Sequence, residues 1–236
     1  MAISRMFQID GKRMKTWNVV HGCRFNCSYC SVKTLVETRL RNTPRYANGM
    51  APGFSEREMR KPFHPGEWVF VGYMGDIACQ PEANILRVIE RIRTRPQVNF
   101  YMQSKNPRVF VNLIEKYGRQ VFPENCWLGT TIETTYRVPC SKAPAPIQRF
   151  EAMAELTLKY GRRTIVSIEP VMDFSPAVFA FWLATIEPDY IFIGADNYGH
   201  RLPEPPRAKL REFIELLRHD HPNVILKFGL GRLLDG

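Results

Sequence analysis

Short apolar runs alternate with amphipathic stretches along most of the chain. The runs have the length and composition of buried strands and lie at 16–20, 68–72, 98–103, 126–132, 164–168, 190–193 and 224–228. Segments with apolar residues at helical spacing lie between them, near 31–40, 83–95, 107–116, 147–160, 176–185 and 206–218. Pro107, Pro176 and Pro206 each stand where a first helical turn would open. Buried strands that alternate with helices predict an α/β fold with a parallel sheet.

Six strand–helix units and a seventh strand fit a partial or open TIM-type (βα)6 barrel, in one domain over residues 1–236. A doubly wound open sheet has the same periodicity and stays open as the alternative. Residues 41–67 interrupt this alternation of strands and helices. They are rich in Pro, Gly and Arg and predict a long loop in the first strand–helix connection. Loops of this length in compact domains are usually functional or mobile.

The chain carries no pattern of export or membrane insertion. Its N-terminal residues lack the apolar core of a signal peptide, and the longest apolar stretch, 178–186, is too short to span a bilayer. We therefore expect a cytoplasmic protein, whose cysteines stay reduced. Six cysteines then suggest metal binding or catalysis rather than disulfides.

Positive charge is concentrated near the N-terminus. Residues 1–62 contain 12 Lys or Arg against 4 Asp or Glu, which accounts for +8 of the net charge of +10. Such a region could contact phosphates. It could equally offset an anionic group or form a solvated face.

The strongest chemical signal is the segment HGCRFNCSYC, which places Cys23, Cys27 and Cys30 in a C-x3-C-x2-C pattern. It follows the first predicted strand, so it lies at the carboxyl rim, where parallel α/β folds place their active sites. Three thiolates on one loop can each bind one iron of a [4Fe–4S] cubane and leave the fourth iron open. A zinc site completed by His21 or another cysteine is the alternative, although the chain has no second CxxC.

The cysteine pattern resembles the signature of the radical S-adenosylmethionine (SAM) enzymes. The aromatic residue before the third cysteine, Tyr29, also matches and in that family lies near the adenine of SAM. The resemblance implies a [4Fe–4S] cluster, SAM chelated to its open iron, and reductive cleavage of SAM to a 5′-deoxyadenosyl radical that acts on a substrate. It also implies an electron donor such as flavodoxin or ferredoxin.

Further segments resemble a subgroup of that superfamily. The stretches FVGYMGDI, MQSKNPRVF, WLGTTIE, SIEPVMDF and DYIFIGADNYG are similar to the phage-associated DUF5131 proteins, and more distantly to spore photoproduct lyase and related enzymes. The resemblance covers roughly residues 16–230, and only the cysteine motif is highly specific. It leaves no room for a large C-terminal cluster domain, so no auxiliary cluster is expected.

The resemblance assigns SAM contacts to residues that follow the strands. After the second strand comes GYMGD, where Asp76 replaces the usual Glu that contacts the SAM amino group. Lys105, after the third strand, would pair with the SAM carboxylate, and Thr131 and Glu133, after the fourth, suit ribose hydroxyls. The remaining assigned positions are Gly75, Ser104, Ser167 and Glu169.

The other cysteines stand singly. Cys126 begins a buried strand and predicts a core thiol, whereas Cys79 follows Asp76 closely enough to approach the pocket. Cys140 lies in the loop after the fourth strand, where a thiol could donate a hydrogen atom to a product radical. It could also be an ordinary loop cysteine.

Two other classes of function use the same residues: an iron–sulfur carrier without catalysis, and a zinc- or iron–sulfur-stabilised nucleic-acid-binding protein. For the enzyme, the basic segment favours a nucleic acid or nucleotide as the substrate. This expectation rests on basic residues with aromatic residues interleaved, namely Arg39, Arg41, Arg45, Arg57, Arg60 and Lys61, with Tyr46, Phe54 and Phe63.

Overall fold

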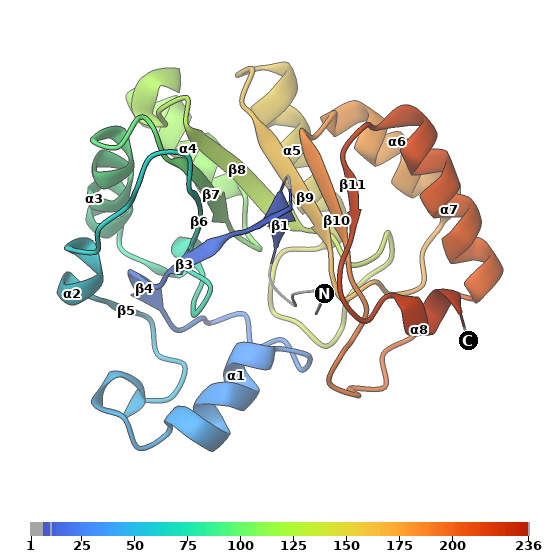
Figure 1. Cartoon of the computed structure of the whole chain (residues 1–236), viewed down its shortest axis with the longest axis horizontal. Coiled ribbons are helices and arrows are strands. Elements are labelled where there is room, and N and C mark those ends of the chain that lie inside the picture. The colour runs from blue at the N-terminus through green and yellow to red at the C-terminus, as the bar shows by residue number, and fades with distance from the viewer. Residues whose placement is uncertain (1–6, 10, 236) are drawn as a thin grey trace.

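A computed structural model describes residues 7–9 and 11–235. Its centre is a curled sheet of seven parallel strands, and helices cover the outer side of this sheet (Figure 1). The strands are β3 (Lys15–Trp17), β6 (Trp68–Val71), β7 (Asn99–Gln103), β8 (Cys126–Thr131), β9 (Thr164–Ile168), β10 (Tyr190–Ile193) and β11 (Val224–Leu226).

The strand order decides between the two predicted architectures. Neighbours in the sheet follow chain order without a reversal, from β3 at one edge to β11 at the other. A doubly wound sheet would reverse its order at a switch point. The prediction of a partial TIM-type barrel is therefore confirmed, with β3 and β11 as its open edges.

Six helices of the described residues follow the strands as predicted, with boundaries shifted by one or two residues except at the first, and the short helices at 56–59 and 231–234 are additions. They are α1 (Ser31–Leu35), α2 (Glu56–Met59), α3 (Glu82–Arg93), α4 (Arg108–Tyr117), α5 (Pro146–Leu158), α6 (Pro176–Ile186), α7 (Arg207–Asp220) and α8 (Gly231–Leu234). The predicted first helix ends as a π-helical turn (Val36–Leu40). Pro107 and Pro206 cap their helices and Pro176 opens α6. Within the described residues no helix is both long and apolar enough to cross a membrane.

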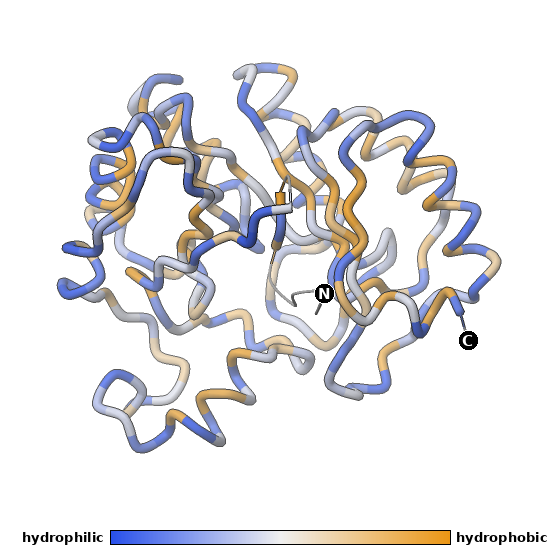
Figure 2. The backbone as a smooth tube through the Cα atoms, in the orientation of Figure 1, coloured by the Kyte–Doolittle hydropathy of each residue, from blue (hydrophilic) through white to orange (hydrophobic). Residues whose placement is uncertain are grey.

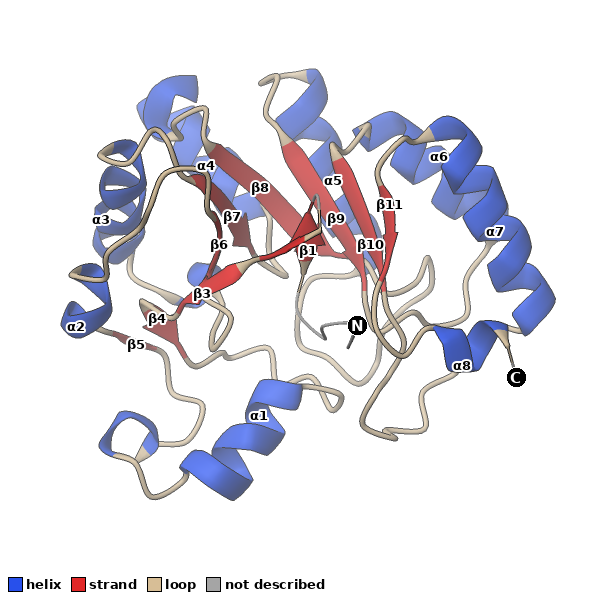
Figure 3. Ribbon diagram, in the orientation of Figure 1, coloured by secondary structure: helices blue, strands red, loops and turns tan. Residues whose placement is uncertain are grey.

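Two short strand pairs are additions to the predicted elements. The hairpin of β1 (Gln8–Ile9) and β2 (Lys12–Arg13) precedes the sheet. β4 (Val20–His21) pairs with β5 (Gly53–Phe54), so the segment 41–67 is partly ordered rather than a plain loop (Figure 3). Two-residue strands carry no readable periodicity, which is why the sequence did not predict them.

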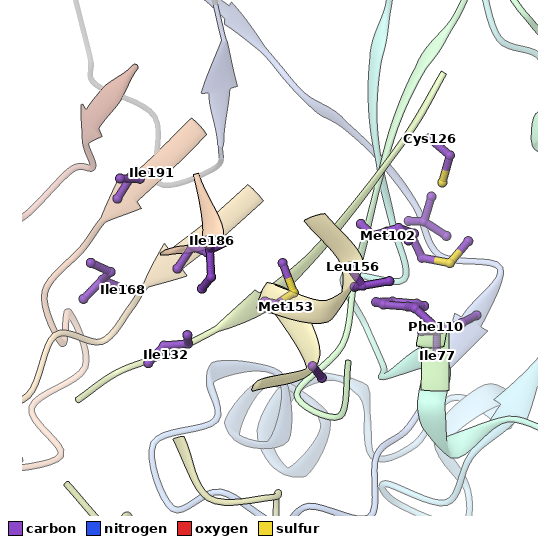
Figure 4. Close-up of a cluster of buried hydrophobic side chains, with 14 of the residues drawn as sticks. Ile77, Met102, Phe110, Cys126, Ile132, Met153, Leu156, Ile168, Ile186 and Ile191 are labelled. Carbon is purple, nitrogen blue, oxygen red and sulfur yellow. The ribbon is translucent and has the colours of Figure 1, made fainter. Parts of the chain in front are cut away.

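The sheet is buried on both faces. Alternate side chains of β6 point to opposite sides: Val69 and Val71 join the core under the helices, whereas Trp68 and Phe70 join a cluster on the concave side. Figure 2 shows the hydrophobic residues concentrated along the central strands, and Figure 4 shows part of the outer core. This double burial explains the continuous apolar runs in the sequence.

Phe7, which begins the described part of the chain, packs on the concave side of the sheet. The ring of Phe7 lies edge-on against Phe70, Tyr101 and Phe192, at centroid distances of 5.0, 5.5 and 4.7 Å. Such pairs add to the stabilisation that area burial gives. These aromatic rings thus pack together on the concave side of the sheet.

The apolar helix α6 provides a test of this packing. Phe179→Ala should lower the free energy of unfolding by about 3–5 kcal/mol, because Phe179 is fully buried and its truncation leaves a cavity. The ring of Phe181, on the same helix, is 64% exposed, so Phe181→Ala should change it by about 0.5 kcal/mol or less. Urea denaturation followed by circular dichroism measures both, and equal losses would contradict the orientation of α6.

Candidate functional site

A cavity of about 270 Å³ opens at the carboxyl ends of the strands, as the sequence predicts for a parallel α/β fold. Ten of the thirteen expected site residues line it, and three lie behind its wall. Those that line it are Cys23, Cys27, Tyr29, Cys30, Gly75, Asp76, Lys105, Thr131, Ser167 and Glu169. The three behind the wall are Ser104, Glu133 and Cys140.

Close backbone packing fixes the start of the cysteine loop. Gly22 has φ +74°, its N–H donates to the carbonyl of Met74 at 3.0 Å, and its own carbonyl accepts from the N–H of Asp76 at 3.2 Å. A Cβ on Gly75 would lie 2.7 Å from the carbonyl oxygen of Gly22. Gly75 is therefore required for the close approach of two backbones, whatever else it contacts.

Backbone N–H groups and one hydroxyl surround the three sulfur atoms of the motif. Phe25 N–H donates to Cys23 Sγ and Lys33 N–H donates to Cys30 Sγ, each at 3.4 Å. Cys27 Sγ lies 3.0 Å from the hydroxyl of Ser141. Burial raises the pKa of Cys30, while N–H donors favour its thiolate and so oppose that rise. In the described part of the chain no three His, Cys, Asp or Glu side chains converge on a single metal-ion position.

Asp76 is held in a fixed orientation at the cavity wall. Its Oδ1 accepts from the hydroxyl of Ser104 at 2.6 Å and from Ala78 N–H at 3.0 Å, and its Oδ2 accepts from Lys105 N–H at 2.8 Å. Burial raises the pKa of Asp76, and these hydrogen bonds oppose the rise. Ser104 thus orients Asp76 from behind and does not reach the cavity itself.

Glu133 connects several parts of the site from beneath. It is fully buried, and its Oε2 accepts from Arg149 Nη1 at 2.7 Å. Its Oε1 accepts from the Tyr29 hydroxyl at 2.7 Å and from Lys105 Nζ. Burial alone would raise the pKa of Glu133, but the charges of Lys105 and Arg149 outweigh it and lower the pKa to about 2.

Arg149 is a residue of the site that the sequence analysis missed. It lies in α5, is fully buried, and donates to the carbonyls of Pro144 and Thr131 in addition to Glu133. A charged residue on the apolar face of a predicted helix was the available signal, because such residues are almost never fully buried unless paired.

The far wall of the cavity contains a second residue that the sequence analysis missed. Lys227, just after β11, forms an ion pair with Glu169 and lies over the ring of Phe7, 4.0 Å from its centroid. Beside them Gln103 Nε2 donates to the Thr131 hydroxyl at 2.7 Å. The short strand β11 thus places the cation of Lys227 on the inside of the half-barrel.

Cys140 lies next to the cysteine loop but outside the cavity wall. Its carbonyl accepts from Ser28 N–H at 2.9 Å, and its side chain packs against the cluster that contains Cys27, Tyr29 and Met172. The loop 132–145 makes a second such contact, from Lys142 N–H to the carbonyl of Phe25 at 2.7 Å. A hydrogen-donor role for Cys140 stays a prediction.

A family model shows to which other sequences this chain is related. The model of DUF5131, described as a protein of unknown function, matches residues 12–175. The chain belongs to the DUF5131 family. The match spans the cysteine loop and β3 to β9 of this DUF5131 protein. No curated protein matches its sequence.

Solved structures share the fold of this DUF5131 protein. Spore photoproduct lyase complexed with dinucleoside spore photoproduct superposes with a TM-score of 0.60 at 10% identity, over 90% of this chain and 76% of that one. A mutant of the same lyase gives a TM-score of 0.58 at 10% identity with the same coverage. At this identity the likeness shows a common partial-barrel fold.

The buried network around Glu133 predicts a pH dependence. A carboxyl whose pKa is lower in the folded than in the unfolded state stabilises the fold above its unfolded pKa, near 4.5, and the stabilisation is lost as the pH falls towards 2. Glu133→Gln should lower the unfolding free energy by about 3–5 kcal/mol at neutral pH, because it leaves Arg149 without a counter-charge, and should flatten this acid-induced loss.

Denaturant titrations across this pH range measure the effect. Glu151→Gln, an exposed position on the same helix as Arg149, is the control and should behave like the native protein. An acid-induced loss of stability as steep in Glu133→Gln as in the native chain would contradict the assigned role of Glu133.

Proposed function

We propose that this protein is a radical SAM enzyme whose [4Fe–4S] cluster is held by Cys23, Cys27 and Cys30. The observation that carries the proposal is their common cavity: three thiols of one loop face the same space as the polar residues that end four neighbouring strands. An iron–sulfur carrier would need no such pocket beside its cluster.

The thiol arrangement fits a cubane with three protein ligands. Each thiolate of such a cluster binds a different iron, so the three sulfur atoms need not converge on one point. The N–H donors to Cys23 and Cys30 suit metal-bound thiolates, because hydrogen bonds to the sulfurs stabilise negative charge there. When bound, the reduced cluster supplies the electron that cleaves SAM to a 5′-deoxyadenosyl radical.

The strand ends supply complementary groups for SAM itself. Asp76 suits the SAM ammonium group, and Lys105 suits the carboxylate, because both contacts are charge-assisted. Thr131, Ser167 and Glu169 line the wall where hydroxyl groups of the ribose can be bound. Glu133 does not reach the cavity and instead positions Tyr29 and Lys105, so its expected contact with ribose is replaced by this supporting role.

We further propose a nucleic acid or nucleotide as the substrate, on a surface different from the one expected. Tyr46 is buried, Phe54 lies under Arg87, and Phe63 packs against Trp17. Of the three rings expected to stack on bases, Tyr46 is therefore unavailable because it is buried, whereas Phe54 and Phe63 are half-buried.

Exposed cations for which no ion pair is described also occupy the rim beside the cysteine loop. Arg24, Arg137 and Lys142 are exposed, and Tyr136 beside them is 51% exposed. These groups can contact phosphates and stack on a base. The similar fold of the lyase that is complexed with a dinucleoside photoproduct supports the same substrate class by analogy.

Anaerobic reconstitution with iron and sulfide tests the cofactor. Single replacements of Cys23, Cys27 or Cys30 by Ala should abolish cluster assembly, as measured by iron content and visible absorbance, while thermal melts show that the fold remains. Cys126→Ala removes a thiol of the hydrophobic core (Figure 4) that does not line the cavity, and it should leave assembly intact. The native cluster should yield 5′-deoxyadenosine from SAM and dithionite.

The outcomes separate the candidate functions. A native protein that takes up zinc and assembles no cluster would leave a zinc-stabilised nucleic-acid-binding protein. A stable cluster that never cleaves SAM would leave an iron–sulfur carrier. Full assembly in any of the three single variants would contradict the ligand assignment.

A titration of short single-stranded DNA and RNA at several salt concentrations tests the substrate class. Affinity should fall steeply with salt, and Arg137→Glu should weaken binding and reduce the slope of log K against log salt by about 1. Arg218→Glu makes the same charge change near the end of α7 and should have little effect. Equal effects of the two reversals, or no binding at low salt, would argue for a small molecule or peptide instead.

A further inference from the structure

The carboxylate of Glu169 occupies space that a side chain at position 194 would take. A Cβ on Gly194 would lie 2.7 Å from Glu169 Oε1 and 2.8 Å from the carboxyl carbon. The Gly194 N–H donates to the carbonyl of Ile168 at 3.0 Å, and the Gly194 carbonyl accepts from Val171 N–H at 2.8 Å. The chain after β10 is thus fixed beside the backbone around Glu169, and the carboxylate lies against it.

Lys227 holds the other oxygen of this carboxylate. Its Nζ forms an ion pair with Glu169 Oε2, and its side chain is only 7% exposed. The Lys227 N–H donates to the carbonyl of Ile193 at 2.8 Å, and the ammonium group lies 4.0 Å from the centroid of the Phe7 ring. Because Lys227 is anchored at both its backbone and its side chain, it fixes the orientation of the Glu169 carboxylate.

The second oxygen of Glu169 is available to a ligand. Across residues 7–9 and 11–235 no donor is described for Oε1, whereas Oε2 accepts from Lys227. Glu169 lines the cavity together with Thr131 and Ser167. An ionised carboxylate can only accept hydrogen bonds, and hydroxyl groups of a ribose are donors that acidic side chains bind in nucleotide-binding folds.

We propose that Lys227 and Gly194 are positioning residues that hold Glu169 so that its Oε1 accepts from a hydroxyl of the SAM ribose. This inference rests on the proposed function. Gly194 leaves room for the carboxylate, and Lys227 engages the oxygen that does not face the ligand. Both act on SAM through Glu169, and both lie beyond residues 12–175, which the family model matches.

The affinity of the reconstituted, unreduced protein for SAM tests this role, measured by isothermal titration calorimetry. Lys227→Met should weaken binding about tenfold, because a carboxylate that has lost its counter-ion no longer keeps the orientation for a charge-assisted hydrogen bond. Lys227→Arg keeps the charge and should recover most of the affinity.

Lys209→Met is the matched control for the loss of a paired lysine. Lys209 Nζ also pairs with a carboxylate, that of Asp173 at 2.7 Å, and lies 6.0 Å from the centroid of the Phe174 ring. Lys209 does not line the cavity, so its replacement should leave the affinity for SAM unchanged.

Two further variants separate positioning from direct contact. Gly194→Ala should displace the end of the flexible Glu169 side chain, so it should keep a nearly native melting temperature while binding SAM about tenfold more weakly. In a Glu169→Ala background, Lys227→Met should cause no additional loss, because effects that act through one residue are not additive. An analogue of SAM without its ribose hydroxyls should bind the native protein and Lys227→Met equally.

The results distinguish this inference from the proposed function. A native protein that assembles no cluster or binds no SAM would overturn both. Native affinity for SAM in Lys227→Met, or in Gly194→Ala if Lys227→Met does not fold, would overturn the positioning role alone. An additional loss in the Glu169→Ala background would mean that Lys227 contacts the ligand directly. Weaker binding of the hydroxyl-free analogue by Lys227→Met would overturn the assignment of the ribose to Glu169.

Discussion

The carboxylate of Glu133 is the interaction on which the candidate site depends. It joins the cysteine loop through Tyr29, the end of β7 through Lys105, and the outer helix α5 through Arg149. A buried charge of this kind is tolerated only when it is paired and hydrogen-bonded, so each partner holds the others in place. The rim of the half-barrel is therefore ordered by electrostatics from below, while the loops above it are ordered mainly by backbone contacts.

Most of the fold could be predicted from the sequence because the sheet is buried on both faces. Continuous apolar strands such as Thr164–Ile168 and Tyr190–Ile193 leave little choice of assignment, and both have the predicted boundaries. The strand order required the structure, since periodicity does not record which strands are neighbours. The packing of Phe7 inside the barrel also could not be predicted, because a single aromatic residue has no pattern.

The site was predictable where spacing reflects chemistry and not where it depends on long-range pairing. The cysteines, Asp76 and Lys105 all follow strands, and strand ends meet at one rim, so their convergence in one cavity follows from the topology. The contacts of Arg149 and Lys227 depend instead on which distant segments come together. The basic segment 1–62 also shows that long-range contacts are hard to predict. Arg45 donates to the backbone carbonyl of Asn18, and Lys61 donates to that of Thr16. A count of charges cannot show such contacts.

The contact of Lys227 with Phe7 and Glu169 joins the two ends of the described chain inside the half-barrel. During synthesis Phe7 leaves the ribosome 220 residues before Lys227 does. Until then the carboxylate of Glu169 lacks its counter-ion, and the last strand of the sheet is missing. The pocket is thus complete only once residue 227 has been made and β11 has paired with β10.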